Sequence, residues 1–357
     1  DSLLSIADVN TVYLPYIDDF HLVLELLEAA GGGGLSGSLI EASLDPAGWF
    51  GRRGVKRIVR LRPGSPEADG IPIEPSPDAD MDRPKIMPKI LPDPGENEIV
   101  DERREGFRAK SYEIVSGSSI VLQTPSGLLD WILIPHVTPA PKENVAAFKK
   151  AIRIALELRP GSKLTSKRLL KGISETKTRK KMKDCYESII VGGSKRLHNR
   201  ISMSLYSGPM GRDSGPMGQA HLARWRSEIM GLQWSSSYKN RNSHYFMPTG
   251  WLGTGDATLK NQCVWESFEA TYRNVRDQIA TIVLPHHGSK HNFRTELLNF
   301  ATVRNAIASA SNPSRYKHPS PTVMYELQHA GVTTWQVSQD VNSELEEIVW
   351  HSRLSLP

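Results

Sequence analysis

The sequence predicts an α/β fold, because two apolar runs with the character of strands flank a segment with the spacing of a helix. The first run, Trp251–Gly255, ends at Asp256, and the second, Ile282–Pro285, ends at His286. Between them, large apolar residues recur at steps of three and four, as they do on one face of a helix. These residues are Trp265, Phe268, Tyr272 and Val275. Strand, helix and strand in this order are typical of an α/β sheet.

Both apolar runs stop at residues that bind ions and protons. A buried strand that ends in Asp or His places that side chain at the rim of the sheet, where ligands of open α/β sheets bind. Asp256 and His286 are therefore candidate site residues, although Asp256 would alternatively cap the helix that follows it. We expect His286 to be the ligand, because it ends the strand, and the adjacent His287 to form a hydrogen bond or touch substrate.

Four segments in order resemble the metallo-β-lactamase fold superfamily, in particular its branch of ComEC-type competence proteins. They are an Asn-containing strand at 197–205, the Gly-Thr-Gly-Asp motif ending at Asp256, the His-His-Gly-Ser motif beginning at His286, and an Asn-x-Tyr-x-His-Pro-x-Pro segment around His318. One such motif is weak support, but four in order are hard to produce by chance. The resemblance implies a metallo-β-lactamase-like αβ/βα sandwich with long insertions, as a single domain over residues 1–357.

The family's first metal motif, His-x-His/Asp-x-Asp-His, is altered in this chain. Its counterpart has Tyr16 in place of the first His and Phe20 in place of the metal-binding Asp, while Asp18 and His21 remain. The strands that precede this motif in the family are expected to lie before Asp1 or to be missing. By resemblance, the metal ligands are Asp18, His21, His198, Asp256 and His286.

The altered motif predicts an impaired or one-metal site for Zn or Mn. Phe cannot coordinate and a neutral Tyr is a poor donor, so each ion of a two-metal site would lose one ligand. A single ion would be held by Asp18, His198 and Asp256, or by His21, His286 and Asp256. Alternatively, His198 is a surface histidine and His21 begins an amphipathic helix.

His318 precedes Pro319 in the last of the four segments. By resemblance, it positions a phosphate or a leaving group, and we count it with Asp256, His286 and His287 as a catalytic candidate. A structural turn before the proline explains it equally well.

Composition and charge limit the class of protein. The 357 residues are 39% hydrophobic and 23% charged, which is typical of a globular protein with a full core. No apolar run approaches the ~20 residues of a membrane span. No signal peptide is recognisable, and the two cysteines, Cys185 and Cys263, form no metal spacing. The sequence therefore predicts a cytoplasmic protein that does not enter a membrane.

Insertions interrupt the predicted domain. Residues 62–105 hold nine of the 24 prolines and many acidic residues. This composition predicts an extended segment that runs over the surface, or an arm that binds a partner. Residues 207–248 are predicted to be a loop insertion. We also expect strands at 55–61, 111–123 and 128–137 and a helix over 141–158.

A basic segment lies at 161–200, where twelve Lys and Arg oppose three acids, in a chain whose net charge is only +5. Such a patch, here Lys163–Arg200, is what a phosphate backbone requires of its partner. A solvated helix face is the alternative.

Three function classes fit these patterns. The first is a metal-dependent hydrolase of the nuclease or phosphodiesterase kind, which Asp256 and His286 favour. The second is an inactive relative that serves as a binding or regulatory subunit through its insertions, which Tyr16 and Phe20 favour. The third is a lactamase, thioesterase or protease, against which the resemblance to the ComEC branch weighs.

Overall fold

The structure is a computed structural model that divides into two compact units. Unit 1 comprises residues 1–116 and 139–198, and unit 2 comprises residues 117–138 and 199–357. The described residues are 4, 8–15, 38, 41–42, 45–62, 89–90, 108–123, 130–137, 142–159, 162, 166–189, 202–209, 217–225, 228–235, 248–299, 303–311, 316–340 and 343–351. None of the helices in these ranges has the length and apolar character that crossing a membrane requires.

Unit 1 contains a four-stranded sheet in the order β1-β2-β4-β3. Its strands are β1 (Thr11–Pro15), β2 (Arg57–Arg62), β3 (Lys89–Ile90) and β4 (Lys110–Val115). The strands β1, β2 and β4 are parallel, and β3 runs antiparallel to β4. Ile58 on β2 is fully buried and packs in a small cluster with Ala47 and Ala109.

The short helix α4 (Pro46–Gly51) precedes β2 and begins at a capping aspartate. Asp45 accepts a hydrogen bond from the N–H of Gly48 at 3.0 Å, which satisfies a donor that the first helical turn leaves unpaired. The guanidinium of Arg108 donates to both oxygens of the same carboxylate, at 2.9 and 3.1 Å. This bidentate pair joins the start of α4 to the chain that leads into β4.

Three helices form the rest of the described part of unit 1: α5 (Lys142–Ala155), α6 (Ser166–Ser174) and α7 (Thr176–Ile189). The helices α5 and α6 bury apolar side chains at a four-residue spacing, and α7 buries one methionine. These residues are Phe148, Ile152, Leu169, Ile173 and Met182. A Cβ on Gly172 of α6 would lie 2.2 Å from Leu156 and 3.4 Å from the sulfur of Met182. The helices therefore pack closely around Gly172, and a larger residue there would require the Leu156 side chain to move.

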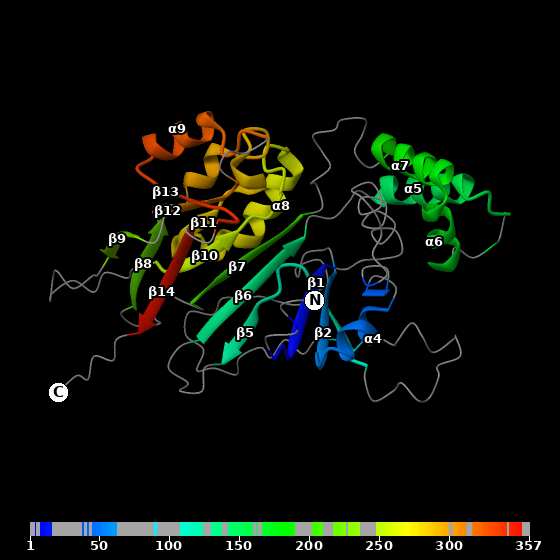
Figure 1. Ribbon diagram of the computed structural model, residues 1–357, viewed down its shortest axis with the longest axis horizontal. Coiled ribbons are helices and arrows are strands. Elements are labelled where there is room, and N and C mark those ends of the chain that lie inside the picture. Colours follow the sequence, from blue (N-terminus) through cyan, green and yellow to red (C-terminus); the bar gives the residue numbers. More distant parts are fainter. Residues whose placement is uncertain are drawn as a thin grey trace. The chain divides into compact units, whose positions relative to one another are not determined.

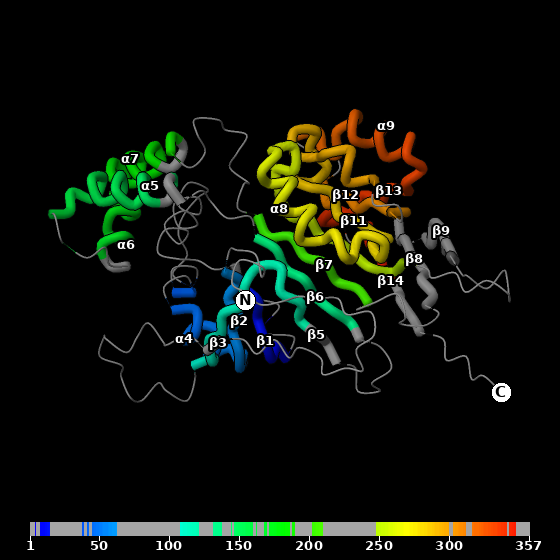
Figure 2. The backbone as a smooth tube through the Cα atoms, turned by 180° about the vertical axis from the view of Figure 1, so that it is seen from behind, coloured from blue at the N-terminus to red at the C-terminus, as the bar shows by residue number. Residues whose placement is uncertain are grey.

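Unit 2 contains a seven-stranded mixed sheet in the order β13-β12-β11-β10-β7-β6-β5 (Figure 1). Its strands are β5 (Ile120–Gln123), β6 (Asp130–Val137), β7 (Met203–Pro209), β10 (Gly250–Gly253), β11 (Ile279–Val283), β12 (Asn305–Ser309) and β13 (Thr333–Val337). The strands β10 to β13 are parallel. Figure 2 shows β5, β6 and β7 side by side, and these strands are antiparallel.

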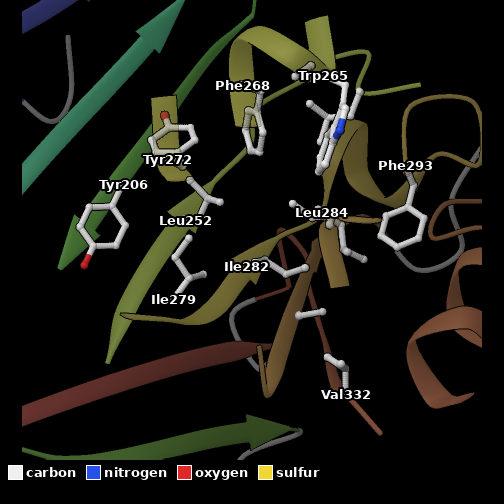
Figure 3. Close-up of a cluster of buried hydrophobic side chains, with 14 of the residues drawn as sticks. Tyr206, Leu252, Trp265, Phe268, Tyr272, Ile279, Ile282, Leu284, Phe293 and Val332 are labelled. Carbon is white, nitrogen blue, oxygen red and sulfur yellow. The ribbon is translucent and has the colours of Figure 1, made fainter. Parts of the chain in front are cut away.

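Two helices connect the parallel strands, α8 (Gln262–Tyr272) between β10 and β11 and α9 (Pro321–His329) between β12 and β13. Both connections step in the same direction across the sheet. Because crossovers between parallel strands are right-handed, both helices lie on the same face. The hydrophobic core of unit 2 lies between this face of the sheet and the two helices. Figure 3 shows aromatic side chains of α8 packed against Leu252, Ile282 and Leu284.

The mixed helices and sheets confirm the predicted α/β class, and the predicted strand, helix and strand are β10, α8 and β11. The helix expected at 141–158 is α5, and the strand expected at 55–61 is β2. The expectation of one strand at 111–123 was wrong. The chain turns at Gly117, where φ is +85°, so that β4 and β5 belong to different sheets. A single domain of the metallo-β-lactamase type remains a prediction.

The predicted insertions contain more regular structure than expected. Within 207–248, β8 (Met217–Trp225) and β9 (Glu228–Ser235) form a three-stranded sheet with β14 (Glu344–His351) in the order β14-β8-β9. Within 161–200, the described residues form α6 and α7. Most of 62–105 lies outside the described residues, apart from Arg62 and β3.

His136 on β6 is a buried histidine that belongs to the core of unit 2. Its Nδ1 lies 3.1 Å from the hydroxyl of Thr271, and its Nε2 lies 3.4 Å from that of Ser267. The Thr271 hydroxyl donates to the carbonyl oxygen of Ser267 at 2.9 Å, so it accepts from the Nδ1–H of His136. Burial lowers the pKa of His136 from its ordinary 6.5 to about 4, and these two hydroxyl neighbours carry no charge.

We predict that unit 2 loses stability as the pH falls from 6.5 towards 4. In this range His136 becomes protonated in the unfolded chain but stays neutral in the folded one, because its pKa is lower there. The contribution of neutral His136 to the free energy of unfolding is fully present above pH 6.5. It is lost as the pH falls through about 4, where the loss reaches about 3 kcal/mol. The measurement is urea unfolding across this range, followed by tryptophan fluorescence. His136→Gln should reduce the pH slope, leaving the smaller part that His318 contributes, whereas His329→Gln, at an exposed position, should keep the full slope. An unchanged slope in His136→Gln would contradict the assignment.

Candidate functional site

The candidate site lies at the carboxyl ends of three neighbouring parallel strands. Gly253 and Val283 end β10 and β11 and are paired in register, and Asp256 and His286 each follow three residues later. His318 lies in the connection that follows β12. The sheet therefore presents three segments, distant in sequence, at one edge, as open α/β sheets do where they bind ligands.

Asp256 faces both members of the histidine pair. Its Oδ2 lies 3.8 Å from Nδ1 of His286, and its Oδ1 lies 3.9 Å from Nε2 of His287. The three side chains are between 32% and 49% exposed, so solvent and ligands reach them. Both separations exceed the ~3.2 Å limit of an ordinary N–H···O hydrogen bond, so the carboxylate is not bonded directly to either ring.

The two separations approach those of donors on a shared cation. Zinc bonds to nitrogen and oxygen are about 2.0–2.2 Å long, so two donors on one tetrahedral ion lie roughly 3.4 Å apart. Asp256 lies 3.8 and 3.9 Å from the two imidazoles, slightly farther than this. It forms a partial ligand set, because among the described residues no group of three or more His, Cys, Asp or Glu side chains is arranged to hold a metal ion.

His318 extends the histidine cluster. Its ring lies edge-on to that of His286, with ring centres 5.7 Å apart, and Tyr316 stacks on it at 6.2 Å. Burial lowers the pKa of His318 from its ordinary value, and the neighbouring imidazoles His286, His287 and His291 lower it further. His318 is therefore neutral at pH 7.

Backbone hydrogen bonds join the segments that carry the site. The N–H of Asp256 donates to Oγ of Ser202 at 2.7 Å, and the N–H of His286 donates to the carbonyl oxygen of Gly255 at 3.0 Å. The side-chain amide of Asn292 donates to the carbonyl oxygen of Asp256 at 3.3 Å. Sequence analysis missed Asn292, since no pattern around it indicates that its side chain is buried.

The site also concentrates unusual backbone conformations. Four residues other than glycine have positive φ in the described part of the chain, and three of them are His286, His287 and Lys317. Each left-handed residue costs about 1–2 kcal/mol. Such outliers cluster where function requires a particular geometry. At His286 and His287 this backbone leaves the two imidazoles 3.8 and 3.9 Å from the Asp256 carboxylate.

The structure brings together Asp256, His286, His287 and His318 of the predicted site residues. Asp18, His21 and His198, the other predicted metal ligands, lie outside the described residues, as do Tyr16 and Phe20. Their part in the site remains a prediction.

Comparison with family models, with curated proteins and with solved structures found no match to this chain.

We predict that Gly255→Ala destabilises unit 2 more than Gly331→Ala does. Both glycines have positive φ, +54° and +71°, so both substitutions strain the backbone. A Cβ at Gly255 would lie 2.5 Å from the carbonyl oxygen of Met203 and 2.6 Å from Oγ of Ser202, whereas one at Gly331 meets nothing within 4 Å. The extra cost should be about 1–3 kcal/mol, measured by urea unfolding. Equal losses in the two variants would show that the turn before Asp256 is not tightly packed.

Proposed function

We propose that this chain is a metal-dependent hydrolase of the metallo-β-lactamase fold, with one divalent ion, Zn or Mn, and a phosphodiester substrate. The observation that carries the proposal is the convergence of Asp256 with His286 and His287 beyond parallel strand ends, at separations of 3.8 and 3.9 Å that approach those of donors on one ion. The four sequence segments that resemble the ComEC branch support the same fold.

Asp256 and His286 would hold the ion, with Asp18, His21 or His198 completing the set as the resemblance implies. A divalent ion bound there supplies a Lewis acid that polarises a phosphoryl oxygen. Imidazole and carboxylate are donors that both Zn and Mn accept.

The remaining side chains would act on the substrate directly. His287 is 49% exposed beside the carboxylate, so its ring can contact a phosphoryl oxygen. His318 is neutral at pH 7 because its pKa is lowered, so its imidazole can orient a phosphoryl oxygen or the leaving group by a hydrogen bond. Asn292 and Ser202 hold the backbone of Asp256 and thereby position its carboxylate.

An inactive binding or regulatory subunit is the second candidate, and a specific observation favours it. Tyr16 and Phe20 stand where the family has two metal ligands. Protein partners would then bind the insertions, including the sheet formed by β8, β9 and β14.

We further propose that the basic helices α6 and α7 bind nucleic acid. Lys177, Lys180, Lys181 and Lys183 are exposed and lie away from Met182, the buried side chain of the same helix. Lys181 lies 3.7 Å from Glu157, but both side chains are more than half exposed, so this pair is weak and water can replace it. The face is therefore available to a phosphate backbone, and releasing counterions would drive binding.

The same proposal places the chain in a reducing compartment such as the cytoplasm. Its two cysteines, Cys185 and Cys263, are both free, which is usual where disulfides do not persist.

We predict that the purified chain binds about one Zn or Mn ion and hydrolyses bis(4-nitrophenyl) phosphate, and that Asp256→Ala abolishes both. Elemental analysis after desalting measures the first property, and release of nitrophenol measures the second. Asp277→Ala is the matched control, because Asp277 belongs to the same unit and is 42% exposed, against 46% for Asp256.

Two outcomes would decide between the candidates. A metal-free chain that Asp256→Ala leaves unchanged would reject the hydrolase and favour the inactive subunit. Loss of metal in both aspartate variants would reject the assignment of Asp256 as a ligand.

We also predict that the chain binds DNA with an affinity that falls steeply with salt, and that Lys180→Gln with Lys181→Gln weakens this dependence. Removing two phosphate contacts should reduce the slope of log K against log salt by about 1–2. Fluorescence anisotropy of a labelled DNA duplex at several salt concentrations measures this slope. Lys56→Gln with Lys110→Gln removes the same charge from exposed positions just before β2 and at the start of β4, and should leave the slope unchanged. A salt-independent affinity would contradict this role of α6 and α7.

A further inference from the structure

Tyr316 is an exposed aromatic side chain next to the candidate site. It is 72% exposed, one of three large hydrophobic side chains so exposed in the described residues, together with Ile154 and Tyr325. An exposed tyrosine alone is ordinary, because folded proteins leave much apolar surface in water. The position of Tyr316 relative to the histidine cluster is what distinguishes it.

A series of contacts leads from Tyr316 to the carboxylate of the site. Its ring stacks on His318, with the ring planes 23° apart and the centres 6.2 Å apart. His318 in turn lies edge-on to His286, whose Nδ1 is 3.8 Å from Asp256. The stacked pair therefore begins in solvent and ends beside the group that would hold the ion.

The backbone between the two rings is held in an unusual conformation. Lys317 has φ of +55°, a left-handed conformation that costs a residue with a side chain about 1–2 kcal/mol. Tyr316 and His318 flank Lys317 and stack on each other across it. Lys317 itself is exposed, so a cation accompanies the stacked pair at the surface.

The chemistry of this surface matches a nucleotide. A tyrosine ring stacked on an imidazole offers a flat face on which any base can stack. The exposed Lys317, and Lys290 in the segment after the histidine pair, provide positive charge for phosphates. An anion without an aromatic ring would use only the lysines, and an apolar ligand would use only the tyrosine ring. A nucleotide uses both, because it has a flat base and a charged phosphate.

We propose that Tyr316, supported by His318, stacks a nucleobase of a single-stranded nucleic acid, so that a neighbouring phosphodiester lies over Asp256 and His286. The inference rests on the proposed function and narrows its substrate to a strand whose bases are unpaired near the cleavage position. Stacking of this kind tolerates every base, because each has a flat face.

The test compares two oligonucleotides that differ only in their bases. Binding of a fluorescently labelled oligothymidylate and of an abasic strand of equal length is measured by anisotropy, in EDTA so that no hydrolysis occurs. Both strands present the same phosphates to α6 and α7, so the ratio of the two affinities reports on base contacts alone.

We expect the wild-type chain to bind the thymidylate strand more tightly, and Tyr316→Ala to weaken that binding by roughly 5- to 150-fold while leaving abasic binding unchanged. Tyr316→Phe should retain the wild-type ratio, because the ring remains. Tyr325→Ala is the matched control: Tyr325 is 66% exposed in the same unit and also stacks on a histidine, His329, but on helix α9.

Equal affinity for the two strands, a Tyr316→Ala variant that keeps the ratio, or an equal loss in Tyr325→Ala would each overturn the inference. These outcomes are independent of metal binding. If the chain binds no ion and hydrolyses no phosphodiester but shows the expected ratios of thymidylate to abasic affinity, the proposed hydrolase function is rejected and the stacking site is supported. If it hydrolyses phosphodiesters without any preference for bases, the stacking site fails and the hydrolase stands.

Discussion

The parallel pairing of β10 with β11 governs everything at the candidate site. Gly253 and Val283 are paired as the last residues of these strands, so Asp256 and His286 project from the same edge after equal lengths of chain. A shift of one residue would turn one strand's side chains to the opposite face and separate the two groups. The buried side chains of β10 and β11 oppose such a shift, because it would expose Leu252 or Ile282 to water.

The fixed ends of β10 and β11 support a backbone conformation at His286 and His287 that would be unfavourable elsewhere. His286 and His287 are consecutive residues with positive φ, and Gly288 continues the turn at +83°. The turn is held from both sides, because the N–H of His286 bonds to Gly255 and the carbonyl oxygen of Gly288 accepts from Ser320. The strain and the hydrogen bonds together orient two imidazoles towards one carboxylate, which a relaxed loop would not do.

The proposals for the two units concern the same kind of ligand. In unit 2, a single carboxylate is surrounded by imidazoles and by exposed lysines on neighbouring segments, an arrangement that suits an anion held through an ion and a stacked ring. In unit 1, α7 carries exposed lysines on the sides of the helix that Met182 does not occupy, an arrangement that suits a phosphate backbone. Both proposals therefore name a phosphate-bearing ligand, whose charge the exposed lysines of each surface would neutralise.

Neighbouring residues were sufficient to predict the elements around Asp256 and His286, because apolar spacing and an abrupt change to polar residues are local properties of a chain. The sequence also singled out His287 and His318. It did not reveal that Asn292 holds the Asp256 loop, that Tyr316 stacks on His318, or that the chain leaves one sheet for another at Gly117. Burial, ring contacts and strand partners depend on residues far apart in the chain, and they exist once the sheet has brought those residues together.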